Sequence, residues 1–212
     1  NVNLSAAAGL TVNGSVNAQN TVSLASGTGE DLVLGGVGTS KGNTVSITSG
    51  QDFIHNGSTI TATKTDVSGS VVINAQRNIE LNAGHLQADN ADFTAVNGFI
   101  SESYTNGESA TASTSYDLQI KKKMQVAAGG ADAQGVAIDL GSRFNKLYDV
   151  IIGNANGDVL IGNGSNGTDR LSIASVTSTG ANGEVVNTTI SGKLVVHNYD
   201  NRNNDLGNNL RV

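Results

Sequence analysis

Apolar residues recur at matching positions in two adjacent segments of the chain, residues 45–70 and residues 71–96. When the second segment is placed under the first without a gap, the main apolar positions stay in register. The matched residues are Val45 and Val71, Ile47 and Ile73, Phe53 and Ile79, Ile60 and Leu86, Ala62 and Ala88, Val67 and Phe93, and the acidic pair Asp66 and Asp92. A period of about 20 to 50 residues is typical of a solenoid, because one repeat buries its apolar side only against the next.

Looser copies of the same pattern precede these two segments. The matches are residues 20–27 with residues 43–50, Val2 and Leu4 with Val22 and Leu24, and Leu10 and Val12 with Leu32 and Leu34. Residues 1–96 therefore predict four successive coils, which lengthen from 20 to 26 residues. At about 3.3 Å per residue, such a coil accommodates three short strands and the corners between them.

The alternation of apolar and polar residues predicts an all-β fold class, and the period makes it a right-handed parallel β-helix (β-solenoid). Val, Ile, Leu and Ala at alternate positions favour half-buried strands, while the frequent Gly and Asn residues tolerate the backbone conformations of sharp corners. We expect residues 1–97 to form β-helix coils and residues 150–197 to form further strands of the coils. Residues 198–212 are almost entirely polar and are expected to be a C-terminal tail.

The coil pattern is interrupted in residues 98–149, which we interpret as an excursion from the β-helix. Residues 102–115 are rich in Ser and Thr and predict a loop, and the alternation in 116–126 and 136–140 around a Gly-Gly turn predicts a projecting β-hairpin. This region contains five of the eight aromatic residues and the run of three lysines. Because exposed aromatic and charged loops favour recognition, the candidate ligand-binding residues are Phe99, Tyr104, Tyr116, Lys121, Lys122 and Lys123.

Composition argues against several function classes. The chain of 212 residues has a net charge of −6, which disfavours nucleic acid or an anionic membrane surface as a partner. It has no Cys, so disulfides and thiol chemistry are excluded, and its apolar runs are too short for membrane insertion. The chain starts at Asn1 without a visible signal peptide, so we expect a processed form or an excised piece of a longer protein.

Three segments approximate the nonapeptide of calcium-binding β-rolls, in which a Gly-rich turn precedes an Asp and a short strand. Their candidate metal ligands are Asp31, Asp158 and Asp169, in residues 26–34, 153–161 and 164–172. Carboxylates and turn carbonyls from adjacent copies would supply the roughly six to eight oxygens that Ca²⁺ takes. The alternative is that Gly-Asn corners before strands resemble the motif by chance, because the copies are not in strict tandem. Calcium is the one candidate cofactor.

The sequence predicts no catalytic constellation. The histidines are too scattered for a metal cluster, and His55 aligns with Leu81, which favours a partly buried structural role. The alternating threonines in residues 59–65 are typical of ice-binding surfaces, but the following repeat replaces them with other residues. The aligned carboxylates Asp66 and Asp92 could act as a catalytic pair, but repeated polar corner residues explain them more simply.

Residues 69–84, GSVVINAQRNIELNAG, resemble the coils of filamentous-haemagglutinin-like exoproteins. These are the large secreted β-helical adhesins of bacterial two-partner secretion and the related autotransporter passengers. The resemblance covers residues 1–97 and, more loosely, residues 150–197. It implies a virulence-associated protein of the bacterial cell surface, whose partner is a glycan or protein on a host or neighbouring cell.

The leading hypothesis is therefore a secreted structural and adhesive segment without catalytic activity. The alternative is a self-assembling subunit of an extracellular filament, pilus or surface layer, because the unpaired strand edges of a β-helix can stack on a copy of themselves. In that case residues 1–19 could also be donated as a strand to a neighbour. A polysaccharide-processing enzyme is the third class considered, since β-helices host such activity.

Overall fold

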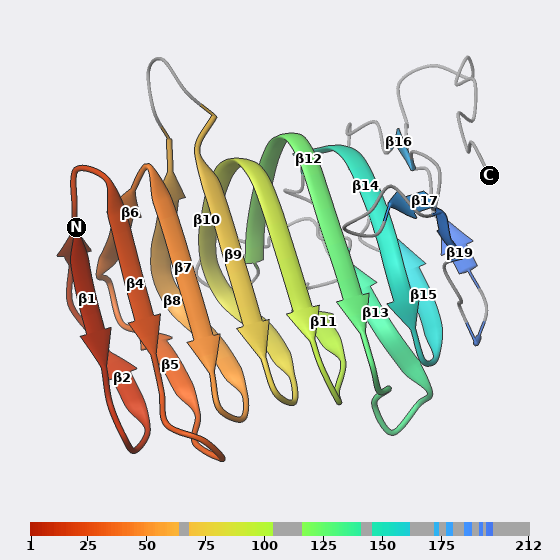
Figure 1. Ribbon diagram of the computed structural model, residues 1–212, viewed down its shortest axis with the longest axis horizontal. Helices are drawn as coiled ribbons and strands as arrows, with labels where there is room; N and C mark the ends of the chain where they lie inside the picture. The colour runs from red at the N-terminus through yellow and green to blue at the C-terminus, as the bar shows by residue number, and fades with distance from the viewer. Residues whose placement is uncertain are drawn as a thin grey trace, which may run out of the picture.

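The computed structural model describes residues 1–63, 68–103, 116–140 and 146–161, and the short segments 172–173, 177–179, 185–187, 191–192 and 194–196. Every regular element within these residues is a β-strand. The strands stack in parallel into a β-solenoid of about six turns, whose long axis is horizontal in Figure 1. The all-β solenoid predicted from the repeat is confirmed.

Each coil contributes strands to three parallel faces. The first face comprises β1 (Val2–Ser5), β4 (Thr21–Ala25), β7 (Thr44–Ser49), β9 (Ser70–Ala75), the ends of β10 (Ile79–Ala95), β12 (Tyr116–Ala128) and β14 (Lys146–Ala155), and β16 (Ser172–Ile173). The second face comprises β2 (Leu10–Val12), β5 (Leu32–Gly35), the starts of β8 (Phe53–Ala62) and β10, β11 (Ile100–Glu102), β13 (Val136–Leu140), β15 (Asp158–Ile161) and β19 (Leu194–Val196). The third face comprises β3 (Val16–Asn17), β6 (Thr39–Gly42), the end of β8, the middle of β10, and the starts of β12 and β14. An antiparallel pair, β17 (Thr177–Thr179) and β18 (Val185–Asn187), forms a second sheet.

The pairing register confirms most of the predicted matches. Residues that share a position in the repeat are hydrogen-bonded neighbours on successive coils, and their apolar side chains point into the interior. The confirmed pairs are Val2 and Val22, Leu4 and Leu24, Leu10 and Leu32, Val22 and Val45, Val45 and Val71, Ile47 and Ile73, Phe53 and Ile79, Ile60 and Leu86, and Ala62 and Ala88. The register follows from the alternation, because a slip by one residue would expose every buried side chain of a strand.

The predicted match between Val67 and Phe93 is wrong. Phe93 pairs with Ile73 on one side and with Val126 on the other, while Val67 and its acidic neighbour Asp66 lie outside the described residues. The reason is the length of one corner. Residues 63–69 connect the third face to the first face after Ala62, whereas the next coil makes the same connection with Asp89 alone. The coil is therefore shorter at this point, and the partner of Ile73 comes earlier in the chain than a strict repeat would place it.

The predicted β-hairpin in residues 116–140 is also wrong. β12 pairs in parallel with β10 and β14, and β13 pairs in parallel with β11 and β15. Figure 1 shows both strands within the stack. Period-two alternation is common to a hairpin and a solenoid coil, so it could not separate the two. The distinguishing signal was the separation of Met124 and Val150 along the chain, because it equals the separation of Val45 and Val71.

One corner between the second and third faces carries a long insertion. Leu81 and Glu102 are partners on the second face, and Gly84 and Tyr116 are partners on the third. Two residues make this corner in the earlier coil, whereas residues 103–115 make it in the later one. The Ser103 amide donates to the Leu81 carbonyl at 2.8 Å, and the Tyr116 amide donates to the Ser103 carbonyl at 3.1 Å. The insertion is therefore closed at its base by the coil itself.

After Ile161, the structure describes only short segments of the chain. β14, β15 and β19 belong to the stack. Residues 162–171, 174–176, 180–184, 188–190, 193 and 197, and the whole predicted tail, residues 198–212, lie outside the described residues. At the other end, β1, β2 and β3 each pair with one strand of the next coil, and Leu4 is exposed.

Candidate functional site

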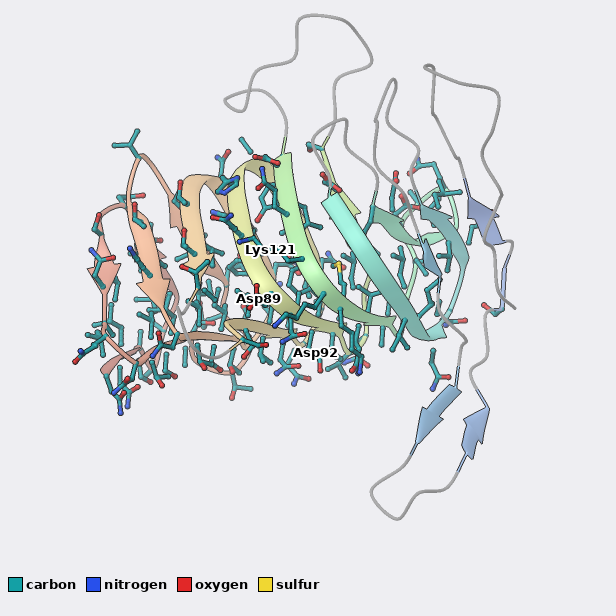
Figure 2. The ribbon with its side chains drawn as sticks, turned by 90° about the horizontal axis from the view of Figure 1, so that it is seen from above. Asp89, Asp92 and Lys121 are labelled. Atoms are coloured by element: carbon teal, nitrogen blue, oxygen red, sulfur yellow. The ribbon has the colours of Figure 1, made fainter. Side chains whose placement is uncertain are left out.

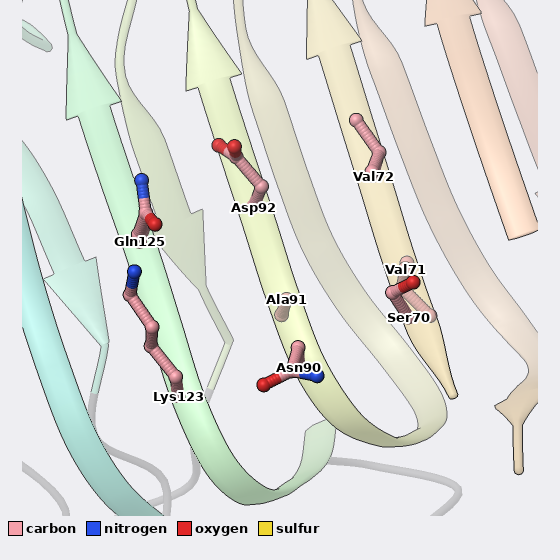
Figure 3. Close-up of a pocket in the computed structure, with 8 residues that line it drawn as sticks. All are labelled: Ser70, Val71, Val72, Asn90, Ala91, Asp92, Lys123 and Gln125. Carbon is pink, nitrogen blue, oxygen red and sulfur yellow. The ribbon is translucent and has the colours of Figure 1, made fainter. Parts of the chain in front are cut away.

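A hollow on the first face of the solenoid is the candidate site. It lies over β9, the end of β10 and the end of β12, and has a volume of about 280 Å³ (Figure 3). The residues that line it are Ser70, Val71, Val72, Asn90, Ala91, Asp92, Lys123 and Gln125. Because side chains alternate along each strand, Val71, Ala91 and Met124 point inward, and Ser70, Val72, Asn90 and Asp92 point outward.

The register places the outward side chains of the hollow in two rows across three coils. Ser70, Asn90 and Lys123 are successive partners in one row. Val72, Asp92 and Gln125 form the second row, two residues further along each strand. Short or compact side chains on β9 and β10 thus face the longer Lys and Gln of β12, which form one wall (Figure 3). Neighbouring strands are about 4.8 Å apart, so the three strands span roughly 10 Å.

The Asp92 carboxyl in the hollow is only partly solvated. Burial raises the pKa of the Asp92 carboxyl, and the charge of Lys123 partly opposes this change. Within the described part of the chain, none of the five polar side chains of the hollow makes a side-chain hydrogen bond to another residue. Their donors and acceptors are available to water or to a ligand.

The three lysines that were predicted to bind a ligand lie where the chain passes from the third face to the first. Lys121, Lys122 and Lys123 are all exposed, between the buried Ile120 and Met124. Lys122 Nζ donates to Ser68 Oγ at 2.6 Å and lies 3.5 Å from an oxygen of Asp89. Figure 2 places Lys121 and Asp89 on the same side of the stack, near Asp92. The run is a solenoid corner, and only Lys123 lines the hollow.

Tyr116 lies in the interior, although the sequence analysis proposed it as a ligand-binding residue. Its side chain is fully buried, and its hydroxyl is 2.6 Å from His55 Nδ1. His55 Nε2 is 2.7 Å from Ser58 Oγ, and both residues are buried. A neutral imidazole has one N–H donor and one lone pair, so it satisfies the two hydroxyls at once. This Ser–His–Tyr cluster resembles a catalytic arrangement in composition, but its burial makes it a structural network.

Burial of His55 predicts a pH dependence of stability. Desolvation lowers the pKa of His55 from 6.5 to about 3, against an opposing contribution from Ser58. The unfolded chain therefore binds this proton first, and the stability contributed by neutral His55 is complete above pH 6.5 and is lost as the pH falls toward 3. We expect a slope of up to about 1.4 kcal/mol per pH unit in this window.

Urea unfolding between pH 4 and pH 7 measures that slope. His55→Phe should remove the contribution, so that its free energy of unfolding varies less steeply with pH than that of the wild type. His85→Gln is the matched control, since His85 is on the surface and bonded to Asp117, and it should retain the slope of His55. Equal slopes in the wild type and His55→Phe would contradict the assignment.

The other predicted ligand-binding residues are not brought together. Phe99 is half-buried at the corner before β11, where its amide donates to Asn78 Oδ1 at 3.2 Å. Tyr104 lies outside the described residues. Of the five candidates that the structure describes, only Lys123 belongs to the hollow, and the buried Tyr116 is not available to a ligand at the surface.

The predicted calcium ligands are far apart. Asp31 and Asp158 occupy equivalent corners, at the start of second-face strands, but they are separated by five coil steps. At about 4.8 Å per step, the separation is roughly 24 Å, so the two residues cannot share an ion. Asp31 Oδ1 accepts a hydrogen bond from the Asp52 amide at 3.0 Å, and Asp169 lies outside the described residues. No group of three metal-ligating side chains occurs in the part of the chain that the structure describes.

A ladder of side-chain oxygens along this corner was missed by the sequence analysis. The Asp52 amide donates to Asp31, the Asn78 amide donates to Asp52 Oδ1 at 2.9 Å, and the Phe99 amide donates to Asn78. Arg77 also pairs with Asp52 through two hydrogen bonds, one of them from Nε at 2.7 Å. Burial raises the pKa of Asp52, but the hydrogen bonds from Arg77 and Asn78 outweigh it and hold this pKa below its usual value. The available signal was an Asp or Asn directly before successive second-face strands.

His85 and Asp117 form a polar pair on the third face. His85 Nδ1 is 2.7 Å from Asp117 Oδ2, and Gln119 Nε2 donates to both oxygens of the same carboxylate. The three side chains come from two adjacent coils, because His85 and Asp117 are register partners. Their hydrogen-bonding groups are engaged with one another, in contrast to those of the hollow.

The described residues contain no helix long and apolar enough to cross a membrane.

Comparison with known proteins leaves the chain without a family assignment. No protein-family model, curated protein or solved structure matches the chain.

Proposed function

We propose that this chain is a non-catalytic structural and adhesive segment of a secreted bacterial surface protein. The solenoid is its scaffold, and the chain inserted at the corner between Ser103 and Tyr116 contacts a partner on another cell. The supporting observation is that β11 and β12, on either side of the insertion, both pair in parallel with β10. A scaffold whose coils continue on both sides of such an insertion is suited to present a variable segment to a partner.

The sequence of the insertion fits this role, and the scaffold around it does not suggest chemistry. Residues 103–115 contain Tyr104 and many Ser and Thr residues. The buried cluster of His55, Ser58 and Tyr116 lies in the interior, which a substrate could not reach. The resemblance to filamentous-haemagglutinin-like adhesins supports the same proposal, including a location at the bacterial surface.

Excision of residues 104–114 is the direct test of the proposal. It leaves Ser103 and Ser115 between Glu102 and Tyr116, which reproduces the two-residue corner of the preceding coil. Because the base is closed by the coil, we expect a folded solenoid whose free energy of unfolding changes by less than about 1 kcal/mol. Binding of the labelled protein to epithelial or bacterial cells should be lost.

A matched control excises residues 64–67 at a different corner, where the chain connects the third face to the first. This variant should retain both folding and cell binding. Undiminished binding by the chain that lacks residues 104–114 would show that adhesion does not depend on the insertion. Absence of binding by the wild type to either cell type would contradict the adhesive role itself.

A further inference from the structure

The hollow on the first face differs from the other polar clusters of the described surface. Side chains in those clusters bond to one another, as in the pairs Arg77–Asp52, His85–Asp117 and Lys122–Asp89. The five polar side chains of the hollow converge on one depression without satisfying one another. A concave site with convergent, unpaired polar groups is the arrangement expected of a binding site.

The chemistry of the lining fits a neutral ligand that carries many hydroxyl groups. Asn90 and Gln125 each offer an amide that donates and accepts, Asp92 accepts, and Lys123 donates. One acid and one base leave the lining without net charge, which disfavours a strongly ionic ligand. Each sugar hydroxyl both donates and accepts, so it can bond to such a mixed set of groups. Burial has removed part of the water around the Asp92 carboxylate. A hydroxyl group of the ligand that donates a hydrogen bond to this carboxylate would therefore stabilise it.

The shape and size of the hollow limit the ligand to about one ring. Its volume of about 280 Å³ is just below the range of roughly 300 to 1,000 Å³ that is common for small-molecule sites. Val72 contributes an apolar side chain beside the polar groups of Asp92 and Gln125 (Figure 3). A pyranose ring has an apolar C–H face and polar edges, so its two kinds of surface match Val72 and the surrounding amides.

We infer that the hollow binds one neutral sugar residue, such as the terminal hexose or N-acetylhexosamine of a glycan. Asp92, Gln125 and Asn90 bond its hydroxyl groups, Lys123 closes one side, and Val72 contacts the ring. The inference deepens the proposed function, on which it rests for the source of the sugar, namely the surface of the partner cell. The sugar site would give the solenoid a second contact with the partner cell, on a different face from the adhesive insertion.

Saturation-transfer NMR with the full chain tests this site. The probes are glucose, galactose, N-acetylglucosamine and N-acetylgalactosamine at millimolar concentrations, since a single ring in a shallow site binds at about the millimolar level. We expect transfer to at least one probe, and its dissociation constant should rise about tenfold or more in Asp92→Asn and in Gln125→Ala. Asn74→Ala is the matched control, because Asn74 is exposed on β9, outside the hollow, and should leave the affinity unchanged.

The outcomes separate this site from the adhesive insertion. The chain that lacks residues 104–114 should bind the sugar as the wild type does, even after it has lost cell binding. Absence of transfer to all four probes would overturn the sugar site and leave the role of the insertion standing. Wild-type affinity in both Asp92→Asn and Gln125→Ala, or an equal loss in Asn74→Ala, would also overturn it. Thermal unfolding of each variant checks that the solenoid is folded. If Asp92→Asn does not fold, the affinity of Gln125→Ala alone tests the sugar site.

Discussion

Gly50→Ala should destabilise the solenoid by about 3 kcal/mol or more, which corresponds to a fall in Tm of roughly 6–12 °C for a chain of this length. A Cβ atom at Gly50 would lie 1.7 Å from the carbonyl oxygen of Gly27 and 2.8 Å from the Cα atom of Thr28, both in the coil below. The clash involves main chain on both sides, so a change of rotamer cannot relieve it. The coils would have to separate at this corner and weaken their hydrogen bonds.

Gly14→Ala is the matched control for Gly50→Ala. A Cβ atom at Gly14 would have no neighbour within 4 Å, and neither glycine has a positive φ that would strain an alanine. The effect of the substitution on the unfolded chain is the same for both, and by itself it should stabilise each variant slightly. We expect Gly14→Ala to unfold within about 0.5 kcal/mol of the wild type. Equal stability of the two variants in urea would show that the coils are not packed this closely.

Tyr116→Ala should lower the free energy of unfolding by about 3–5 kcal/mol, the range for loss of a buried aromatic side chain. The substitution leaves a cavity in the interior and removes the hydroxyl that faces His55 Nδ1. Tyr116→Phe keeps the ring and removes only the hydroxyl, so we expect a smaller loss of about 1–3 kcal/mol. Urea unfolding at pH 7 measures both.

A surface role for Tyr116, as the sequence alone suggested, makes the opposite prediction. In that case Tyr116→Ala would change stability by less than about 1 kcal/mol and would abolish ligand binding directly. Lys121→Ala provides the comparison, because Lys121 is exposed and its substitution should be nearly neutral. Wild-type stability in Tyr116→Ala would contradict the buried cluster.

The regular part of the fold was predictable because the interior constrains it. Apolar side chains must face one another on successive coils, so pairs such as Ile47 and Ile73 were evident from their spacing. Corners carry no such constraint, since a connection can lengthen without touching the interior. For this reason the spacing could not reveal that Asp89 alone replaces a much longer connection, or that Phe93 stacks on Ile73.

The burial of Tyr116 had a signal in the sequence that the count of aromatic residues obscured. Tyr116, Leu118 and Ile120 are in the same phase of the alternation, and all three point inward. The hollow could not be predicted in this way. Its strands are joined by coil steps of unequal length, because the step from Val71 to Ala91 is short and the step from Ala91 to Met124 includes the long insertion.

Cross-linking of Gln87 to Gln119 tests whether β12 lies within the stack of coils. The chain contains no Cys, so cysteines introduced at these two register partners would be the only thiols. Partners on adjacent coils are about 4.8 Å apart, which is within the Cα separation of about 4.4–6.8 Å that a disulfide spans. Lys41 lies on the same row but three coils from Gln119, at roughly 14 Å, and serves as the control.

After mild oxidation, mass spectrometry should detect an intramolecular disulfide in the Gln87→Cys, Gln119→Cys variant and none in the Lys41→Cys, Gln119→Cys variant. A hairpin that projects from the solenoid would hold Gln119 away from Gln87. Absence of the first disulfide, or equal cross-linking in both variants, would contradict the stacked coils described above.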